Sequence, residues 1–177
     1  MHRSLLSAAL VVIVGLSGCS TVTAPPPRAG TTSGSVPTPP AGDYVQLANP
    51  GDAEQIVLYA YGLLGTGYRF GGRNPEAGLD CSGMVSYIVE QVSGVRLPHN
   101  AAQIAAKTRV IDAGALQPGD LVFFNTLNRP YSHMGIYLGD GKFIHAPSSK
   151  GQVRVERMDN RYFARRFDGA RSLQSDS

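Results

Sequence analysis

The chain has 177 residues, 42% of them hydrophobic and 16% charged, so it can form one folded domain and is not a disordered polyelectrolyte. Two of the 16 basic side chains precede residue 43 and all 13 acidic side chains lie from residue 43 onward, so most of the chain is nearly neutral despite a pI near 9.0. Acidic residues also interrupt the arginines near the C-terminus, which predicts a mixed solvated surface and excludes a nucleic-acid partner.

Residues 1–18 have the pattern of a signal peptide. Arg3 supplies a positive start, and residues 5–16 form an unbroken run of apolar and small side chains. As a helix this run would rise about 18 Å, which is too short for a hydrocarbon core of about 30 Å. We therefore expect a cleaved targeting segment rather than a stable membrane span.

The end of this segment, Leu16-Ser17-Gly18-Cys19, resembles the lipobox of bacterial lipoproteins. In such proteins cleavage precedes the cysteine and its thiol is lipidated, so the resemblance implies that the protein meets the membrane through a lipid anchor on Cys19. Because Ser20 follows, it also implies a place in the cell envelope, on the outer membrane facing the periplasm in a Gram-negative cell. The alternative is an ordinary signal peptide with a cysteine here by chance.

Residues 19–45 are predicted to be a flexible tether that follows the lipidated cysteine. Most of this segment is Ser, Thr, Gly, Ala and Pro, with proline-rich runs at 25–27 and 37–40. Such a composition cannot form a packed core and favours an extended, partly polyproline chain. We therefore expect a single folded domain over residues 46–177.

The first half of that domain has helical periodicity. Apolar residues between 53 and 64 recur at helical spacing, with Asp52 as a candidate N-cap and Gly65 as a candidate stop. A glycine-rich loop at 67–72 follows. A second helical stripe runs from Val85 to Val92 and should end near Gly94, and a short third helix fits residues 100–107.

The second half changes to strand patterns. Residues 120–124 read as a buried strand, 135–138 and 142–146 flank a turn at 139–141, and 153–155 alternate like another strand. Helices first and strands afterwards predict the α+β class.

The turn at 139–141 decides whether His133 and His145 share a face of the sheet. A two-residue turn would place His145 opposite Ile136, on the face away from His133. A three-residue loop with Gly141 in the left-handed region would place it opposite Gly135, diagonal to His133. We predict the odd-length loop, and both rings on one face beside Cys81.

Cys81 is the candidate nucleophile. It lies in the first turn of the second helix, after the candidate N-cap Asp80, where the helix dipole and free N–H groups are expected to lower the pKa of its thiol. The same N–H groups could stabilise an oxyanion. If Cys19 carries lipid, Cys81 has no disulfide partner within the chain. The alternative is a buried cysteine that acts as a small hydrophobic residue.

His133 and His145 are the candidate base and its orienting group. A general base is held in place by a second polar group, and the two arms of one hairpin could supply both. His99 is expected to be a loop or helix-start residue outside the chemistry. A zinc site made of Cys81, His133 and His145 lacks a fourth ligand and paired cysteines, so we expect neither metal nor cofactor.

Five segments in order resemble the successive motifs of the NlpC family of peptidoglycan endopeptidases: 67–72, 79–83, 116–124, 132–137 and 143–146. The resemblance implies a papain-like fold, with N-terminal helices packed on a central antiparallel sheet. It implies that Cys81 is the nucleophile, His133 the base and His145 the third polar residue of the triad. The remaining residues that it implies at the oxyanion or substrate site are Tyr68, Asp80 and Ser82. His99 departs from the family, which often has Arg at that position.

The family resemblance implies a monomeric thiol peptidase that cleaves stem peptides or cross-links of peptidoglycan, its substrate, without a cofactor. Two alternatives use the same fold: a wall-binding lipoprotein without activity, and a related amidase or acyltransferase. The bond that is cut does not follow from the residues. Within the family the γ-D-glutamyl–diaminopimelate bond is common, whereas lipid-anchored single-domain members resemble enzymes that open D,D cross-links, and we favour the cross-link.

Overall fold

The computed structural model describes residues 44–148 and 151–175, so the predicted signal peptide, the Cys19 lipidation site and nearly all of the predicted tether lie outside the described residues. Within the described part, no helix is long and apolar enough to cross a membrane. The elements follow in this order: α1 Asp52–Gly62, β1 Arg73–Asn74, β2 Gly78–Leu79, α2 Cys81–Ser93, α3 Ala101–Ala106, β3 Arg109–Ile111, a 3-10 turn Ala113–Ala115, β4 Leu121–Phe124, β5 His133–Gly139, β6 Lys142–His145, β7 Arg154–Arg157, α4 Arg161–Ala164 and β8 Phe167–Ser172.

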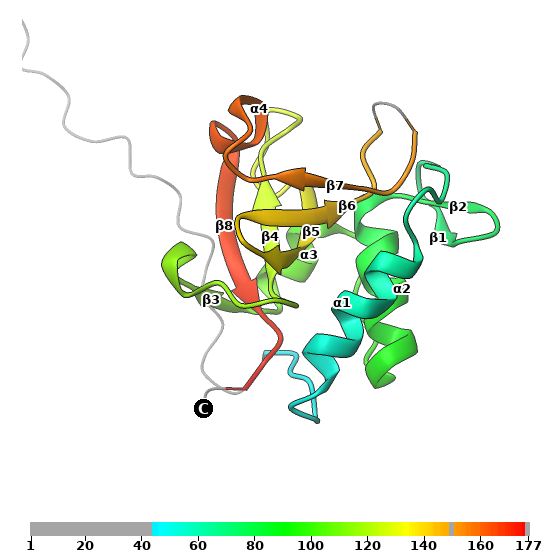
Figure 1. Ribbon diagram of the computed structural model, residues 1–177, viewed down its shortest axis with the longest axis vertical. Coiled ribbons are helices and arrows are strands. Elements are labelled where there is room, and N and C mark those ends of the chain that lie inside the picture. Colours follow the sequence, from blue (N-terminus) through cyan, green and yellow to red (C-terminus); the bar gives the residue numbers. More distant parts are fainter. Residues whose placement is uncertain (1–43, 149–150, 176–177) are drawn as a thin grey trace, which may run out of the picture. The chain divides into compact units, whose positions relative to one another are not determined.

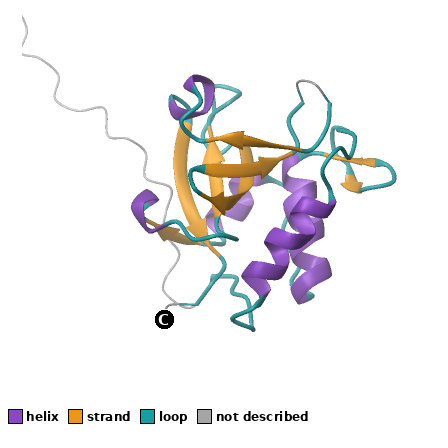
Figure 2. Cartoon of the chain, in the orientation of Figure 1, coloured by secondary structure: helices purple, strands orange, loops and turns teal. Residues whose placement is uncertain are grey.

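Six strands form one antiparallel sheet in the order β3-β8-β4-β5-β6-β7. Helices α1 and α2 pack on each other, and both contact β5, so they cover one side of the sheet (Figures 1 and 2). The prediction of an α+β fold with N-terminal helices packed on a central antiparallel sheet is confirmed.

Helix α2 begins and ends where its local signals predict. The carboxylate of Asp80 accepts the backbone N–H of Gly83 at 2.7 Å, which satisfies a donor that the first helical turn leaves free. Gly94 ends the helix in the left-handed region, at φ 72°. Its fully buried face contains Val85 and Ile88. Cys81 is therefore the first residue of a rigid, well-buried helix.

Helix α1 differs from the prediction at both ends. Gly51 occupies the N-cap position without a side-chain bond, and Asp52 lies inside the helix. The Asp52 carboxylate instead accepts the backbone N–H of Asn49 at 3.4 Å. The helix ends at Gly62 rather than near residue 64, because the chain must turn back so that the N–H of Gly65 can reach the carbonyl of Val153 at 3.0 Å.

The loop of the β5–β6 hairpin differs from the predicted one, but the hairpin still places His133 and His145 on one face. Gly139 pairs with Lys142, so the loop has two residues, and the three-residue loop was wrong. Both loop residues have positive φ, 50° at Asp140 and 68° at Gly141, which suits the twist of a two-residue hairpin.

A β-bulge restores the register that the histidines need. It lies between Tyr137 and Gly139, and beyond it Tyr137 pairs with Phe143 and Ile136 with Ile144. The extra residue therefore lies in β5 instead of in the loop. Continued to the next pair, this register sets His145 opposite Gly135 and on the face that carries His133.

The two faces of the sheet have separate cores. Alternate residues of β4 and β5, such as Phe123 and Met134, pack in the cluster shared with the helices. On the other face, Val122, Phe124, Phe143 and Phe163 form an aromatic cluster. Parity along the strands places His133 and His145 on this second face, away from the helix layer.

Because Gly135 has no side chain, His145 can lie close to it. A methyl group added at position 135 is therefore expected to destabilise the hairpin. A Cβ at this position would lie 2.6 Å from the carbonyl oxygen of Ile144 and 3.2 Å from the Cβ of His145. We expect Gly135→Ala to lower the free energy of unfolding by about 1–3 kcal/mol, measured by urea denaturation, because β6 must shift away from β5. Gly62→Ala is the control, since nothing lies within 4 Å of its added Cβ. Equal stability of the two variants would show that the hairpin does not depend on this close approach.

Candidate active site

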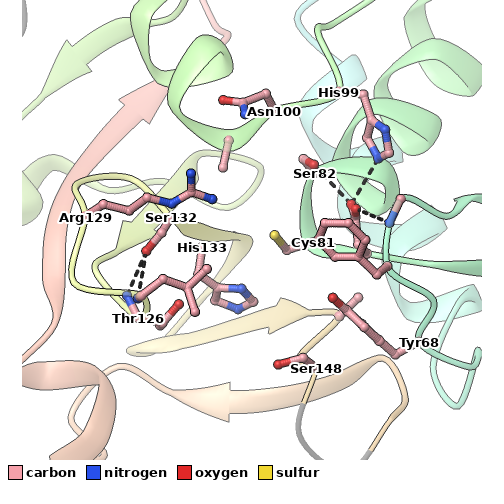
Figure 3. Close-up of a pocket in the computed structure, with 16 residues that line it drawn as sticks. Tyr68, Cys81, Ser82, His99, Asn100, Thr126, Arg129, Ser132, His133 and Ser148 are labelled. Carbon is pink, nitrogen blue, oxygen red and sulfur yellow. Dashed lines mark hydrogen bonds and ion pairs between the residues drawn. The ribbon is translucent and has the colours of Figure 1, made fainter.

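Cys81 and His133 line the same cleft, which has a volume of about 240 Å³. The thiol enters from the start of α2 and the imidazole from the start of β5, and Figure 3 shows the two side chains facing each other across the cleft. Loops complete the walls, and their lining residues include Tyr68, Phe70, His99, Thr126, Leu127, Arg129 and Ser148. The site is thus assembled where the helix layer meets the end of the sheet.

His145 lies within hydrogen-bond distance of His133. The Nε2 of His133 and the Nδ1 of His145 lie 2.7 Å apart, and the side chain of His145 has no exposed surface. The ring of His145 packs on Phe143 and Phe163, with centroid distances of 4.9 and 5.2 Å. This contact occupies the Nε2 of His133 and leaves its Nδ1 for the cleft. The prediction that the two rings share a face is confirmed.

Burial holds both imidazoles in the neutral form. Desolvation, followed by the nearby charge of Arg154, lowers the pKa of His133 to about 4, although Asp80 acts in the opposite direction. Desolvation, and then the proximity of His133 and Arg154, lowers the pKa of His145 to about 2. Because both values lie far below 7, His133 can accept a proton at neutral pH.

The expected low thiol pKa of Cys81 was wrong. Desolvation and then the carboxylate of Asp80 raise it to about 11. Hydrogen bonds from the backbone N–H groups of Met134, Ser82 and Cys81 itself lower it, as the helix start predicts, but they do not compensate for burial. Burial therefore favours a thiol beside a neutral imidazole in the free site.

Tyr68 lines the cleft beside Cys81 (Figure 3). Desolvation and the charges of Asp80 and Cys81 raise the pKa of its phenol, so the hydroxyl keeps its proton. The backbone N–H of Tyr68 donates to Gly151 at 2.6 Å, which fixes the loop that carries it. A protonated, partly buried hydroxyl at this position can donate a hydrogen bond to a developing oxyanion.

Asp80 and Ser82 are engaged by the protein itself. The Asp80 carboxylate accepts hydrogen bonds from the hydroxyl of Ser82 at 3.0 Å and from the backbone N–H of Gly71 at 2.9 Å, in addition to its N-cap bond. Ser82 is buried, and its hydroxyl turns toward Asp80. These contacts tie the glycine-rich loop to the start of α2, and so hold Tyr68 and Cys81 in one wall.

His99 lies in the cleft wall, which the sequence reasoning missed. Its Nδ1 accepts from the Nε of Arg73 at 2.8 Å, so its Nε2 carries the proton and donates to Asp80 at 3.0 Å. Its side chain is 12% exposed. The available signal was its place directly before Asn100, the N-cap of α3.

The β4–β5 loop is a second part of the cleft that sequence reasoning did not identify. Thr126 and Arg129 line the wall opposite Tyr68 (Figure 3), and Leu127 of the same loop also lines the cleft. The position of this loop directly before His133 was the signal that could have indicated it. Within residues 44–148 and 151–175, no group of three or more His, Cys, Asp or Glu side chains is arranged to hold a metal ion.

Known proteins share this domain. The NlpC/P60 family model matches residues 65–172. The chain is 35% identical over 115 residues to murein DD-endopeptidase MepH of Escherichia coli (strain K12), covering 63% of this chain and 42% of MepH. It is 34% identical over 165 residues to the probable endopeptidase NlpC of the same strain, covering 93% of this chain and 96% of NlpC. It therefore spans less than half of MepH and nearly all of NlpC.

A solved structure agrees with the sequence comparisons. The crystal structure of the NlpC/p60 domain of the peptidoglycan hydrolase SagA matches with a TM-score of 0.60 and 34% identity, covering 68% of this chain and 97% of that domain. The match to the family model extends over the cleft, from the Tyr68 loop to β8. The chain belongs to the NlpC/P60 family.

Proposed function

We propose that this protein is a thiol endopeptidase that hydrolyses peptide bonds of peptidoglycan. The observation that carries the proposal is the meeting of Cys81 with the His133–His145 pair in one cleft. A nucleophile, a base and an orienting group are the parts that acyl transfer needs. Family membership and the named activities of MepH and SagA support peptidoglycan as the substrate class.

The proposed reaction starts from the neutral pair. The sulfur of Cys81 attacks the peptide carbonyl carbon while the Nδ1 of His133 takes the thiol proton. Backbone N–H groups at the start of α2 and the hydroxyl of Tyr68 stabilise the oxyanion. The imidazolium of His133 then protonates the leaving amine as the C–N bond breaks. Water, deprotonated by His133, hydrolyses the thioester and restores the thiol.

The bond that we propose is a D,D cross-link. MepH is named a murein DD-endopeptidase, and its similarity to this chain supports the cross-link as the bond that is cut. We further propose that the protein acts as a monomer, because all the residues invoked in the reaction come from one chain.

The lipid anchor is also a proposal. The lipobox-like Leu16-Ser17-Gly18-Cys19 supports a lipid on Cys19, and residues 19–45 would act as a tether for the domain that follows. An anchored domain on a flexible tether can search the peptidoglycan near the membrane surface. The proposed anchor would hold the protein in the cell envelope, on the periplasmic side of the outer membrane in a Gram-negative cell.

Replacement of the thiol tests the proposed activity. Cys81→Ala should abolish release of peptides from purified sacculi, measured by mass spectrometry of the products, because it removes the sulfur on which the acyl-enzyme would form. Products from the wild type should be monomeric stem peptides if a D,D cross-link is cut. Circular dichroism provides the control that the variant is folded. Cleavage by Cys81→Ala at the wild-type rate would disprove the thiol mechanism.

Replacement of Cys19 tests the anchor separately. Cys19→Ala removes the thiol that would be acylated, so the protein should leave the detergent-soluble membrane fraction or remain there with its signal peptide uncleaved. Immunoblotting of cell fractions and the intact mass of the product distinguish these two forms. A Cys19→Ala protein that stays in the membrane with its signal peptide removed would show that a lipid on Cys19 is not the anchor.

A further inference from the structure

The β4–β5 loop, residues 125–132, is held rigidly beside the cleft. At its base, the hydroxyl of Ser132 accepts the backbone N–H groups of Thr126 at 2.9 Å and Leu127 at 3.1 Å. The backbone N–H of Tyr131 donates to the carboxylate of Asp168 at 2.7 Å. The first two contacts join the two ends of the loop to each other, and the third attaches the loop to β8.

A buried arginine adds a third attachment. Arg171 of β8 donates from one guanidinium nitrogen to the hydroxyl of Tyr131 at 2.9 Å and from another to the carbonyl of Ala105 at 3.1 Å. Its residue surface is only 6% exposed. Because Asp168 and Arg171 of β8 both bind Tyr131, and Arg171 is itself held by the carbonyl of Ala105 in α3, the backbone of the loop has a defined position beside the cleft.

Arg129 stands at that tip and is not engaged by the protein. It lines the cleft together with Cys81 and His133, and its side chain extends from the loop into the space in front of the thiol (Figure 3). Among the residues that the structure describes, it makes no hydrogen bond, ion pair or ring contact. Its five N–H donors are therefore available to a ligand in the cleft.

The charges around the cleft make this arginine distinctive. Asp80 is the carboxylate of the lining, and its oxygens already accept Gly71, Ser82, Gly83 and His99. His133, on the same lining, is held uncharged by burial. Within the described part of the chain, Arg129 is the arginine of the cleft lining, on the wall opposite Tyr68, whereas the charge of Arg154 acts on His133 from outside the lining.

We propose that Arg129 is a specificity-determining residue that binds a free carboxylate of the peptidoglycan stem peptide next to the bond that is cut. This inference rests on the proposed function. Stem peptides carry carboxylates on D-glutamate, on diaminopimelate and at the terminal D-alanine. The planar guanidinium can bind one of them through two parallel hydrogen bonds, which fixes the orientation of the peptide as well as its position. The rigid loop lowers the entropy that such a contact must overcome.

The experiment compares substrates with one kind of carboxylate removed at a time. A cross-linked muropeptide dimer is prepared in its free-acid form and in three forms, in which the carboxylates of D-glutamate, of diaminopimelate or of the terminal D-alanine are converted to amides. Purified full-length wild type, Arg129→Gln and Arg129→Lys are assayed on all four. Arg161→Gln is the matched control, because it removes the same charge from an exposed residue of α4 outside the cleft lining.

We expect Arg129→Gln to lower kcat/KM on the free-acid dimer about tenfold, mainly through KM, since a charge-assisted contact is lost. On one of the amide forms, kcat/KM of the wild type should fall by a similar factor, whereas kcat/KM of Arg129→Gln should fall no further. That form identifies the carboxylate that Arg129 binds. Arg129→Lys should retain part of the preference, and Arg161→Gln should resemble the wild type. Binding of the same dimers to Cys81→Ala, with and without Arg129→Gln, should show the same pattern without turnover.

Two results would overturn the inference alone: full activity of Arg129→Gln on the free-acid dimer, or an equal further loss for this variant on all three amide forms. Either result would leave cleavage by the wild type, and hence the proposed function, intact. A wild type that cleaves none of the dimers or sacculi would instead reject the proposed function together with the inference.

Discussion

The hydrogen bond of 2.7 Å between His133 and His145 is the contact on which the geometry of the cleft depends. It exists because one extra residue between Tyr137 and Gly139 shifts the pairing of β5 and β6. Without that bulge, the two-residue turn would place the rings on opposite faces of the sheet. The aromatic cluster around His145 and the absence of a side chain on Gly135 then leave a single arrangement for the pair.

The candidate active site joins the two faces of the sheet. The thiol comes from α2, which packs on one face, whereas the histidines extend from the other, and they meet at the start of β5. Burial is the consequence of this meeting. It moves the pKa of Cys81 up to about 11 and the pKa of His133 down to about 4, so the ionised pair is disfavoured before substrate binds. Backbone N–H groups at the start of α2 can then act on the charge that develops during attack.

Local signals predicted the parts of this structure that local interactions determine. Asp80 and Gly94 delimit α2 because an N-cap and a left-handed C-cap involve only neighbouring residues. The strands β4 to β6 followed from their apolar residues and the turn residues between them. The predicted loop length was wrong because the sequence does not reveal the bulge beside Gly139, which has φ 97°. A bulge has no clear local sequence pattern.

Local sequence patterns did not predict the contacts between residues that are far apart in the chain. Strand β8 contains Asp168, Gly169 and Arg171, so it has no apolar alternation, and the partners that neutralise the cost of burying Arg171 lie about 40 and 66 residues away. The raised thiol pKa of Cys81 likewise depends on what surrounds the helix start, which a helix dipole alone does not specify. His99 and Arg129 entered the cleft for the same reason, since its walls are loops that the fold brings together.

The tautomer of the histidine pair tests this account most directly. A base that accepts the thiol proton must have a bare Nδ1, so His133 must carry its proton on Nε2 and donate it to the Nδ1 of His145. NMR of ¹⁵N-labelled imidazoles in the free protein at pH 7 measures the protonation of each ring nitrogen. The account predicts two neutral rings, with His133 protonated at Nε2. A doubly protonated His133, or a proton on its Nδ1 in a neutral ring, would contradict it.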